Sequence, residues 1–238
     1  MKYGFINSIQ TLGTLDGPGV RYVVFLQGCP LRCGYCHNPE TQENSGGKIF
    51  SSDDIIDKVV RYKEYFGKEG GITVSGGEPL LQAEFVAELF EKCHQNNVNT
   101  CLDTSGCIIN EAVLKVLDLT DYVMLDIKFT NDDDYKKYVG CSLSKPLEFL
   151  KLLEGKNKNV KLRQVIVPTL NDDDENILKL SEIANSFSCV KQVELLPFKK
   201  ICKSKYDAIN REFEFEKFDV PVKESIDALQ NKLNSLIK

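Results

Sequence analysis

Short apolar runs alternate with helical patterns along most of the chain. Runs rich in β-branched and aromatic residues predict six strands, and apolar residues recur at helical spacing between them. The predicted strands cover residues 20–27, 71–75, 98–103, 121–127, 160–167 and 190–196. Strands that alternate with helices through short connections favour parallel strands covered by helices.

Helix signals fill the intervals between these strands. Ser51 or Ser52 is expected to cap a helix with Asp53 and Asp54 in its first turn. Further helices are predicted near 82–96, 110–117 and 174–187, with two short helical pieces after the fourth strand. The acidic runs at 131–137 and 171–176 are expected to cap helices rather than to bind calcium, because neither has calcium-loop spacing. A last helix carries apolar residues on one face, namely Ile226, Leu229, Leu233 and Ile237.

This pattern indicates an α/β fold. Six parallel strands form either a doubly wound sheet or an open, partial (β/α)6 barrel, and periodicity alone does not separate the two. No Pro-, Gly- or Ser-rich linker interrupts the 238 residues, so we expect a single domain over 1–238. A short N-terminal segment, 1–19, and a C-terminal segment, 197–238, are expected to pack on its core.

Charge and composition narrow the possible functions. The formal net charge is −5 and there is no basic run, so a nucleic-acid partner is not expected. No apolar run is long enough to cross a bilayer, and the first ten residues lack the apolar core of a signal peptide. We therefore expect a cytoplasmic protein without a membrane partner. Its nine cysteines, an odd number, do not indicate a disulfide framework.

The unusual residues follow the predicted strands. Polar, cysteine- or glycine-rich turns come after five of the six strands, at 28–38, 75–79, 102–106, 126–128 and 195–198. In parallel α/β folds, active sites form beyond the carboxyl ends of the strands. The sequence therefore predicts an active-site face at that end.

Cys29, Cys33 and Cys36 lie within eight residues in the spacing C-x3-C-x2-C. A structural zinc site usually has four protein ligands, and His37 follows Cys36 too closely to share one ion easily. A [4Fe–4S] cluster is normally held by four thiolates, so three leave one iron open, as a catalytic cluster requires. A zinc-holding binding module and a set of packing thiols remain as alternatives.

The cysteine motif, with Tyr35 before its last cysteine, resembles the signature of radical S-adenosylmethionine (SAM) enzymes. Six blocks occur in order, the second of which contains this motif: DGPGVR, FLQGCPLRCGYCHNP, GGK, SGGEPLLQAEF, TCLDTSG and YVMLDIK. Together they resemble the glycyl-radical-enzyme activases, most closely the formate-lyase type. The resemblance spans nearly the whole chain and is weakest at 201–222. It implies the radical SAM core, a partial (β/α)6 barrel.

The resemblance also implies a reaction. A reduced [4Fe–4S] cluster passes an electron to SAM, and the resulting 5′-deoxyadenosyl radical removes a Cα hydrogen from a glycine of a partner glycyl radical enzyme. Pyruvate formate-lyase is the expected partner, and flavodoxin or ferredoxin the expected electron donor. The alternatives are an activase of another glycyl radical enzyme, or a radical SAM enzyme that acts on a small molecule or RNA.

The resemblance assigns roles by residue. Cys29, Cys33 and Cys36 would hold the cluster. The residues expected to bind SAM are Tyr35, His37, Gly76, Gly77, Glu78, Asp126, Ile127, Lys128, Arg163, Val165 and Lys199. Among them, Glu78 is expected to bind or orient the SAM ammonium and Arg163 to pair with its carboxylate. Asp103, Thr104 and Met124 resemble a site for a monovalent cation.

One position departs from the family pattern. The family often has a histidine after the last strand, where this chain has Lys199 in LPFKK. The only histidines are His37 and His94, and neither is expected to be near enough to substitute. The other six cysteines are expected to be packing thiols.

Overall fold

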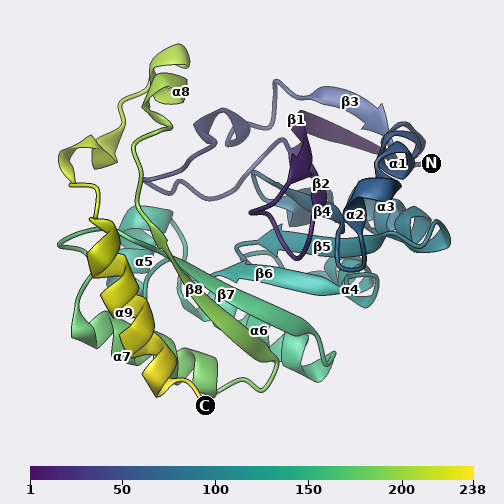
Figure 1. The fold of residues 1–238 in the computed structure, drawn as a ribbon. Coiled ribbons are helices and arrows are strands. Elements are labelled where there is room, and N and C mark those ends of the chain that lie inside the picture. The colour runs from purple at the N-terminus through teal and green to yellow at the C-terminus, as the bar shows by residue number, and fades with distance from the viewer. The chain divides into compact units, whose positions relative to one another are not determined.

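The chain divides into two compact units that interleave in sequence. Unit 1 contains Met1–Pro30 and Thr41–Met124, and unit 2 contains Leu31–Glu40 and Leu125–Lys238. The structure is a computed structural model that describes residues 1–238. Figure 1 labels its helices and strands. No helix has the length and apolar character that a membrane span requires.

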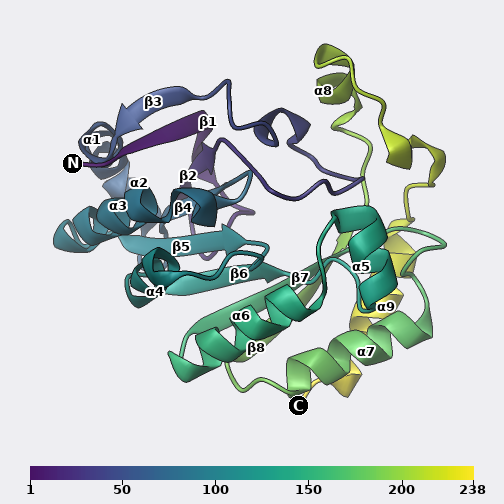
Figure 2. The same cartoon turned by 180° about the vertical axis from the view of Figure 1, so that it is seen from behind.

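Unit 1 is built around parallel strands with an antiparallel pair beside them. Its strand order is β3-β1-β2-β4-β5; β2, β4 and β5 run parallel, whereas β1 is antiparallel to both β2 and β3. Figure 2 shows α3 and α4 on the face of these strands turned toward the viewer. The elements of unit 1 are β1 (Tyr3–Gly13), β2 (Arg21–Leu26), β3 (Lys48–Ser51), α1 (Ser52–Arg61), α2 (Lys63–Phe66), β4 (Gly71–Gly76), the 3-10 turn η2 (Pro79–Gln82), α3 (Ala83–Gln95), β5 (Asn99–Thr104) and α4 (Glu111–Asp118).

The sequence did not predict β1 and β3. No strand was predicted within the segment 1–19, whereas β1 is an eleven-residue strand of the sheet. Its middle reads NSIQT, and most of its side chains are exposed or half-buried. Such a strand has little apolar signal of its own, because backbone pairing with β2 and β3 holds it in place.

Arg21 ties the beginnings of three strands together. Its side chain is fully buried, and its guanidinium donates to Thr73 Oγ1 at 3.0 Å, to Asn99 Oδ1 at 2.8 Å and to the Glu69 carbonyl at 3.0 Å. A buried charge is tolerated only when its hydrogen-bonding capacity is used. The DGPGVR block that ends in Arg21 therefore has a structural role.

Unit 2 contains the later strands and helices. β6 (Tyr122–Asp126) begins in unit 1 and ends in unit 2. The other elements are α5 (Asp132–Val139), α6 (Ser144–Gly155), β7 (Asn159–Ile166), α7 (Asp174–Asn185), β8 (Val190–Pro197), α8 (Lys203–Ala208), the 3-10 turn η3 (Glu214–Lys217) and α9 (Lys223–Leu236); the turn η1 (Pro39–Thr41) crosses the boundary between the units. β7 and β8 run parallel.

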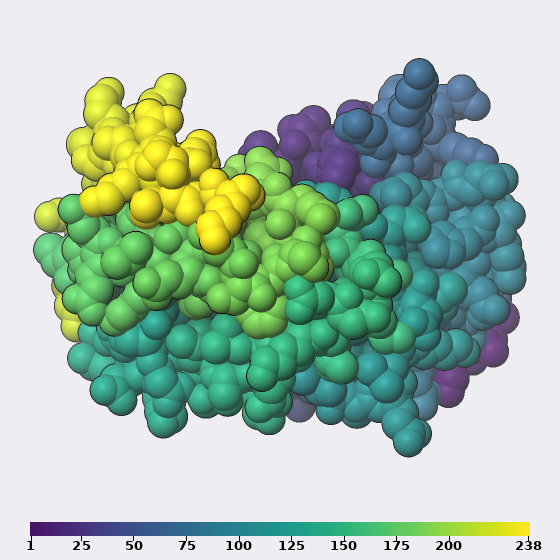
Figure 3. Space-filling view, turned by 90° about the horizontal axis from the view of Figure 1, so that it is seen from below, coloured from purple at the N-terminus to yellow at the C-terminus, as the bar shows by residue number.

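The last helix covers the free edge of β8. β8 ends the strand order, and an open strand edge is a site for unwanted pairing. Gln230 of α9 accepts from the Leu195 amide at 2.8 Å and donates to the Val193 carbonyl at 3.1 Å. Figure 3 shows the yellow C-terminal residues lying on the green surface of unit 2. α9 thus closes the sheet edge through side-chain hydrogen bonds as well as apolar contacts.

The α/β class is confirmed, and the six predicted strands correspond to β2 and β4–β8. Three predicted helix caps are also observed. Ser51 caps α1 in a reciprocal capping box with Asp54. Asn131 and Asp173 cap α5 and α7, at 2.8 Å to an amide in each case. These acidic runs are therefore helix starts, as expected.

Candidate functional site

The three cysteines of the motif divide between the two units. Cys33 and Cys36 belong to the cysteine loop, residues 31–40 of unit 2, whereas Cys29 lies in unit 1. The Cys36 amide donates to the Cys33 carbonyl at 3.1 Å, so these two residues share one turn. Within either unit, no group of three His, Cys, Asp or Glu side chains is close enough to hold a metal ion. Ligation by all three cysteines therefore stays a prediction.

The cysteine loop is fixed to the end of α5. Arg32 donates its amide to the Val139 carbonyl at 3.0 Å, and Gly34 donates to the Tyr138 carbonyl at 3.0 Å. A Cβ at Gly34 would stand 2.1 Å from the ring of Phe215, so only glycine fits there without movement. The turn that carries Cys33 and Cys36 is therefore held in place before any ligand binds.

Aromatic rings surround the middle of the loop. Tyr35 is buried, with its ring centroid 5.4 Å from that of Phe215 and 6.2 Å from that of Phe129. Phe215 also packs edge-on against Tyr138, at 5.5 Å between centroids. The hydroxyl of Tyr35 is buried without a hydrogen-bond partner. Burial raises the pKa of this phenol, so it remains a proton donor.

Asp126, at the end of β6, and Lys128, just after it, form an ionic cluster with Arg163 of β7. Arg163 donates to Asp126 Oδ1 from Nε at 3.0 Å and from Nη2 at 2.8 Å, and Lys128 Nζ donates to Oδ2 at 3.0 Å. Their side chains are 27, 14 and 12% exposed for Asp126, Lys128 and Arg163. Burial would raise the pKa of the Asp126 carboxyl, but the two cations outweigh it and hold that pKa at about 2.

This cluster has one positive charge in excess. Burial would lower the pKa of Lys128, but Asp126 outweighs it and raises that pKa, so Lys128 stays charged. Burial raises the pKa of the Cys33 thiol to about 12, and the Lys128 ammonium opposes the rise. The excess charge therefore favours an anionic group, such as a thiolate or a carboxylate, beside Cys33.

His37 lies beside the position where the family histidine was expected. Its Nε2 is 3.2 Å from the carbonyl oxygen of Lys199. The expectation that neither histidine could be near this position was therefore wrong for His37. Burial lowers the pKa of His37, and because a carbonyl can only accept, the neutral ring carries its proton on Nε2.

Glu78 is the centre of a buried hydrogen-bonded hub in unit 1. Oε1 accepts from the Leu80 amide at 3.1 Å and from the Thr104 hydroxyl at 2.6 Å. Oε2 accepts from the amide and the hydroxyl of Ser105, at 2.9 and 2.5 Å. A carboxylate has about four lone-pair sites, so these four bonds use its capacity. Here Glu78 joins the end of β4 to the end of β5.

At positions 76 and 77, at the end of β4 in unit 1, there is room only for glycine. Gly76 has φ +110°, and a Cβ there would stand 2.3 Å from the Leu26 amide nitrogen. A Cβ at Gly77 would stand 2.1 Å from the Gly28 carbonyl oxygen. The close backbone approach that these glycines permit in the structure is thus to β2 and the residues after it.

The residues expected at a cation site have other partners as well. Asp103 Oδ2 accepts from the Ser75 hydroxyl at 2.8 Å, and the Thr104 hydroxyl is used by Glu78. Met124 is buried in β6. A monovalent cation at these residues stays a prediction.

Two further predicted residues contribute backbone rather than side-chain chemistry. The Ile127 amide donates to the Arg163 carbonyl at 2.9 Å, which aligns the end of β6 with β7. Val165 pairs with Leu196 in the ladder between β7 and β8. Both residues lie in the segments that carry the ionic cluster.

Helix α8 was not predicted from the sequence. Lys205 of α8 donates to Asn38 Oδ1 at 2.8 Å and to Glu40 Oε1 at 2.7 Å, so α8 is bound to the cysteine loop. The next residue, Tyr206, is buried, and its hydroxyl has no hydrogen-bond partner. α8 lies where the family resemblance is weakest, and no motif in the sequence indicated its role.

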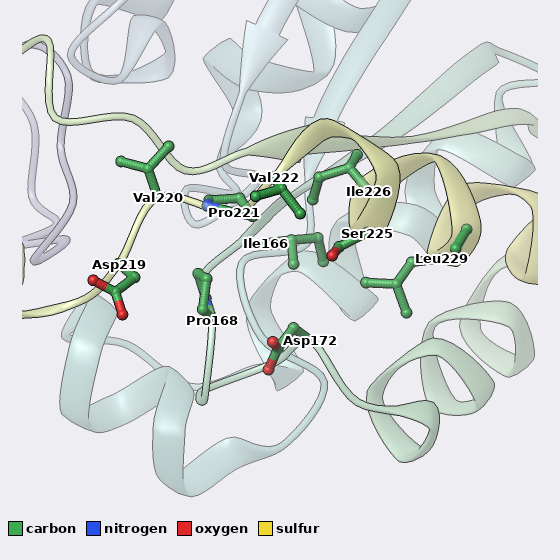
Figure 4. A pocket seen from close by; sticks show the side chains of 11 residues that line it. Ile166, Pro168, Asp172, Asp219, Val220, Pro221, Val222, Ser225, Ile226 and Leu229 are labelled. Carbon is green, nitrogen blue, oxygen red and sulfur yellow. The ribbon is translucent and has the colours of Figure 1, made fainter.

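A separate pocket of about 400 Å³ lies in unit 2 between the end of β7 and the start of α9. Figure 4 shows Ile166, Pro168 and Asp172 on one side and the residues around Val222 on the other. None of the predicted site residues lines it. The pocket is therefore distinct from the predicted site.

Comparison with protein families gives a match over two thirds of the chain. The family described as the Radical SAM superfamily matches residues 23–181. The chain is 40% identical over 233 residues to the pyruvate formate-lyase 1-activating enzyme of Escherichia coli K12, covering 97% of this chain and 95% of that protein. It is 41% identical over 239 residues to the pyruvate formate-lyase-activating enzyme of Clostridium pasteurianum, covering both proteins fully.

Solved structures agree on the fold. A domain of the pyruvate-formate lyase-activating enzyme of Bacteroides vulgatus has a TM-score of 0.58 at 21% identity, over 70% of this chain and 94% of that one. Streptococcus suis SuiB bound to the precursor peptide SuiA has a TM-score of 0.69 at 14% identity, over 87% of this chain and 43% of that one. These identities support the fold alone.

Proposed function

We propose a function from the family, because the chain belongs to the radical SAM superfamily and, within it, to the pyruvate formate-lyase-activating enzymes. Membership implies a [4Fe–4S] cluster and SAM as cofactors. We propose that the partner protein is pyruvate formate-lyase, that flavodoxin or ferredoxin supplies the electron, and that the reaction takes place in the cytoplasm. When bound, the cofactors supply a carbon radical that removes a Cα hydrogen from one glycine of the partner.

The residues present fit these cofactors. The chain offers three closely spaced thiols and no fourth nearby, which suits a cluster with one open iron. Two buried hydroxyls, of Tyr35 and Tyr206, have no partner among the protein's own groups. A buried donor without an acceptor indicates a missing partner, and cluster sulfur or SAM oxygen would provide one.

We assign the ionic cluster to SAM. Lys128 and Arg163 carry two positive charges against the single carboxylate of Asp126, so an anionic group of SAM would balance the excess. Arg163 would bind the SAM carboxylate while it keeps its hydrogen bonds to Asp126. Asp126 and Lys128 would orient the ribose and other polar groups of SAM.

The remaining predicted residues would surround SAM or hold the loops around it, rather than form ion pairs with it. Tyr35 and His37 would lie near the adenine, and the backbone at Lys199, Ile127 and Val165 would line its site. Glu78 would act through the loops that it joins, because its own oxygen atoms are already used. Gly76 and Gly77 have no side chains, so the backbone at the end of β4 would be able to approach SAM closely. That backbone is already held in position by its close packing on β2.

We also propose a monovalent cation at Asp103, Thr104 and Met124. The Asp103 carboxylate would supply the charge, and the backbone carbonyl oxygens of the other two residues could ligate. SAM affinity measured by calorimetry in potassium, sodium and choline buffers tests this proposal. Equal affinity in all three would contradict it.

The observation that carries the proposal is the near-complete match to activating enzymes together with the three thiols of the motif. The test uses anaerobically reconstituted protein, which should be brown and bind about four irons per chain. With reductant, SAM and pyruvate formate-lyase, it should give the doublet of a glycyl radical in electron paramagnetic resonance. A colourless protein with one zinc would contradict the proposal.

The same assay separates two narrower alternatives. A doublet with another glycyl radical enzyme, and none with pyruvate formate-lyase, would reassign the partner. SAM cleavage without a doublet on any glycyl radical enzyme of the same source would indicate a small-molecule substrate.

A further inference from the structure

Two tyrosine hydroxyls are buried without a hydrogen-bond partner, and both belong to unit 2 at the cysteine loop. Tyr35 is part of the loop, and Tyr206 is 2% exposed on α8. The family resemblance gives Tyr35 a role but gives Tyr206 none. A buried hydroxyl that lacks an acceptor destabilises the protein, so its position needs another explanation.

Several contacts fix Tyr206 beside the loop. The neighbouring residue Lys205 donates to Asn38 and Glu40, which follow Cys36 closely in sequence. Four residues before the start of α8, at Lys199, the backbone carbonyl contacts His37. Because these contacts join residues 199–205 to residues 37–40, the ring of Tyr206 is held next to the cysteine turn.

The ring of Tyr206 is also held in its orientation. Its centroid is 4.8 Å from that of Phe213, and the Arg211 guanidinium lies over it, 5.7 Å from the centroid. The Arg211 amide donates to the Tyr206 carbonyl at 3.0 Å. The hydroxyl therefore cannot turn into solvent without breaking this packing.

The hydroxyl remains a donor in these surroundings. Burial raises the pKa of Tyr206, and its electrostatic interactions with Cys36, Cys202 and Cys33 place these three residues near its hydroxyl. A phenol in this state keeps its proton at every pH at which the protein functions. The sulfur of Cys36 is thus near a fixed, protonated donor.

We propose that Tyr206 donates a hydrogen bond to an inorganic sulfide of the iron–sulfur cluster bound beside Cys36, and thereby raises the reduction potential of the cluster. The inference rests on the proposed function, because it needs a cluster at the cysteine motif. A hydrogen bond to cluster sulfur stabilises the added negative charge of the reduced state, and such bonds are among the factors that set cluster potentials. Tyr206 would in this way make the cluster easier to reduce.

The test compares Tyr206→Phe with a matched control, Tyr22→Phe. Tyr22 is equally buried, at 2% exposure, but lies in β2 of unit 1. Each protein is reconstituted anaerobically and titrated with a redox mediator series, and the reduced cluster is measured by electron paramagnetic resonance. Tyr206→Phe should lower the ratio of reduced to oxidised cluster at a fixed potential about tenfold, which is about 59 mV for one electron. Tyr22→Phe should not change it.

Two further measurements separate this role from a purely structural one. Double resonance of the reduced protein in D2O should detect an exchangeable deuteron near the cluster, and Tyr206→Phe should lose it. Replacing Tyr206 by 3-fluorotyrosine, a stronger donor, should shift the potential upward. The cluster-free Tyr206→Phe protein should melt no lower than the cluster-free wild type, because it loses only an unpaired hydroxyl.

The outcomes are distinct. An unchanged potential in Tyr206→Phe, with a full cluster, would overturn the inference and leave the proposed function intact. If Tyr206→Phe retains no cluster, an unchanged potential in the fluorotyrosine protein would overturn the inference in the same way. Failure of the wild type to bind iron would instead overturn the proposed function.

Discussion

Buried polar groups all have hydrogen-bond partners in the Glu78 hub of unit 1, whereas two of them lack a partner at the cysteine loop of unit 2. In the hub, four donors from Leu80, Thr104 and Ser105 fill the carboxylate of Glu78. At the loop, the hydroxyls of Tyr35 and Tyr206 are buried without an acceptor. A buried polar group without a partner costs about 1–3 kcal/mol. The hub is therefore complete without a ligand, whereas the loop is not.

Because of this difference, we expect substitutions in the two regions to affect different properties, protein stability in the hub and cofactor binding at the loop. Changes in the hub should act on the stability of the cofactor-free protein, because all of its hydrogen bonds are internal. Changes at the loop should act on the cofactors, because the buried hydroxyls of Tyr35 and Tyr206 have no internal partner. The predictions below test this division.

The largest effect is expected for the cysteines themselves. Cys33→Ala should reduce the iron content from about four per chain to a small residue, and it should abolish the glycyl radical signal, because a cluster with two thiolates is not held. Cys189→Ala, a buried thiol near Leu150, should retain both iron and signal. Iron analysis measures the iron content, and electron paramagnetic resonance measures the glycyl radical signal. Retention of a full cluster in Cys33→Ala would contradict the ligand assignment.

Loss of the Glu78 charge should act on folding. Glu78→Gln replaces one carboxylate oxygen by an NH2 group, which faces a backbone amide donor in either orientation, from Leu80 or from Ser105. We therefore expect the unfolding free energy of the cofactor-free protein to fall by roughly 3 kcal/mol. Urea denaturation measures this change. Glu84→Gln removes an exposed carboxylate that pairs with Lys2 and should leave the denaturation midpoint near that of the wild type. Equal midpoints for all three proteins would show that the hub is not a stabilising centre.

The ionic cluster should make stability depend on pH. The folded pKa of Asp126 is about 2, below its usual value, so its contribution is present above about pH 4 and is lost as pH falls through about 2. In this window the wild type should lose stability more steeply than Asp126→Asn, by at most about 1.4 kcal/mol per pH unit. Denaturant titrations at several pH values between 4 and 2 measure both slopes. Parallel slopes would mean that Asp126 is not held charged by Lys128 and Arg163.

The smallest effect is expected where α8 meets the cysteine loop. Lys205→Ala removes a partly exposed ion pair with Glu40, so the unfolding free energy should fall by only about 0.5 kcal/mol. Exchange at the amides of His37, Asn38 and Glu40 should nevertheless rise, because the loop loses its side-chain hydrogen bonds to α8. Lys179→Ala, which removes an exposed pair on α7, is the matched control and should not alter exchange there. Unchanged exchange at these amides in Lys205→Ala would contradict this prediction.

The sequence predicted elements whose signals are local. Strands β2 and β4–β8 have strong apolar runs, and the caps Ser51, Asn131 and Asp173 satisfy amides only three residues away. β1 was missed because its side chains are largely exposed and its partners lie in other segments. Likewise, no local signal in residues 203–208 indicated that Tyr206 would be buried beside the cysteine loop.

The spacing of Cys29, Cys33 and Cys36, the alternation of strands and helices, and the helix caps were determined by the sequence alone, because each depends on residues close together in the chain. The tertiary structure decided that Glu78 is saturated by internal donors, that His37 meets the Lys199 carbonyl, and that the Tyr206 hydroxyl is buried without a partner. The Thr104–Glu78 and His37–Lys199 contacts join residues that are 26 and 162 positions apart. Local patterns carry no information about such pairs, because only the packed fold brings them within hydrogen-bonding distance.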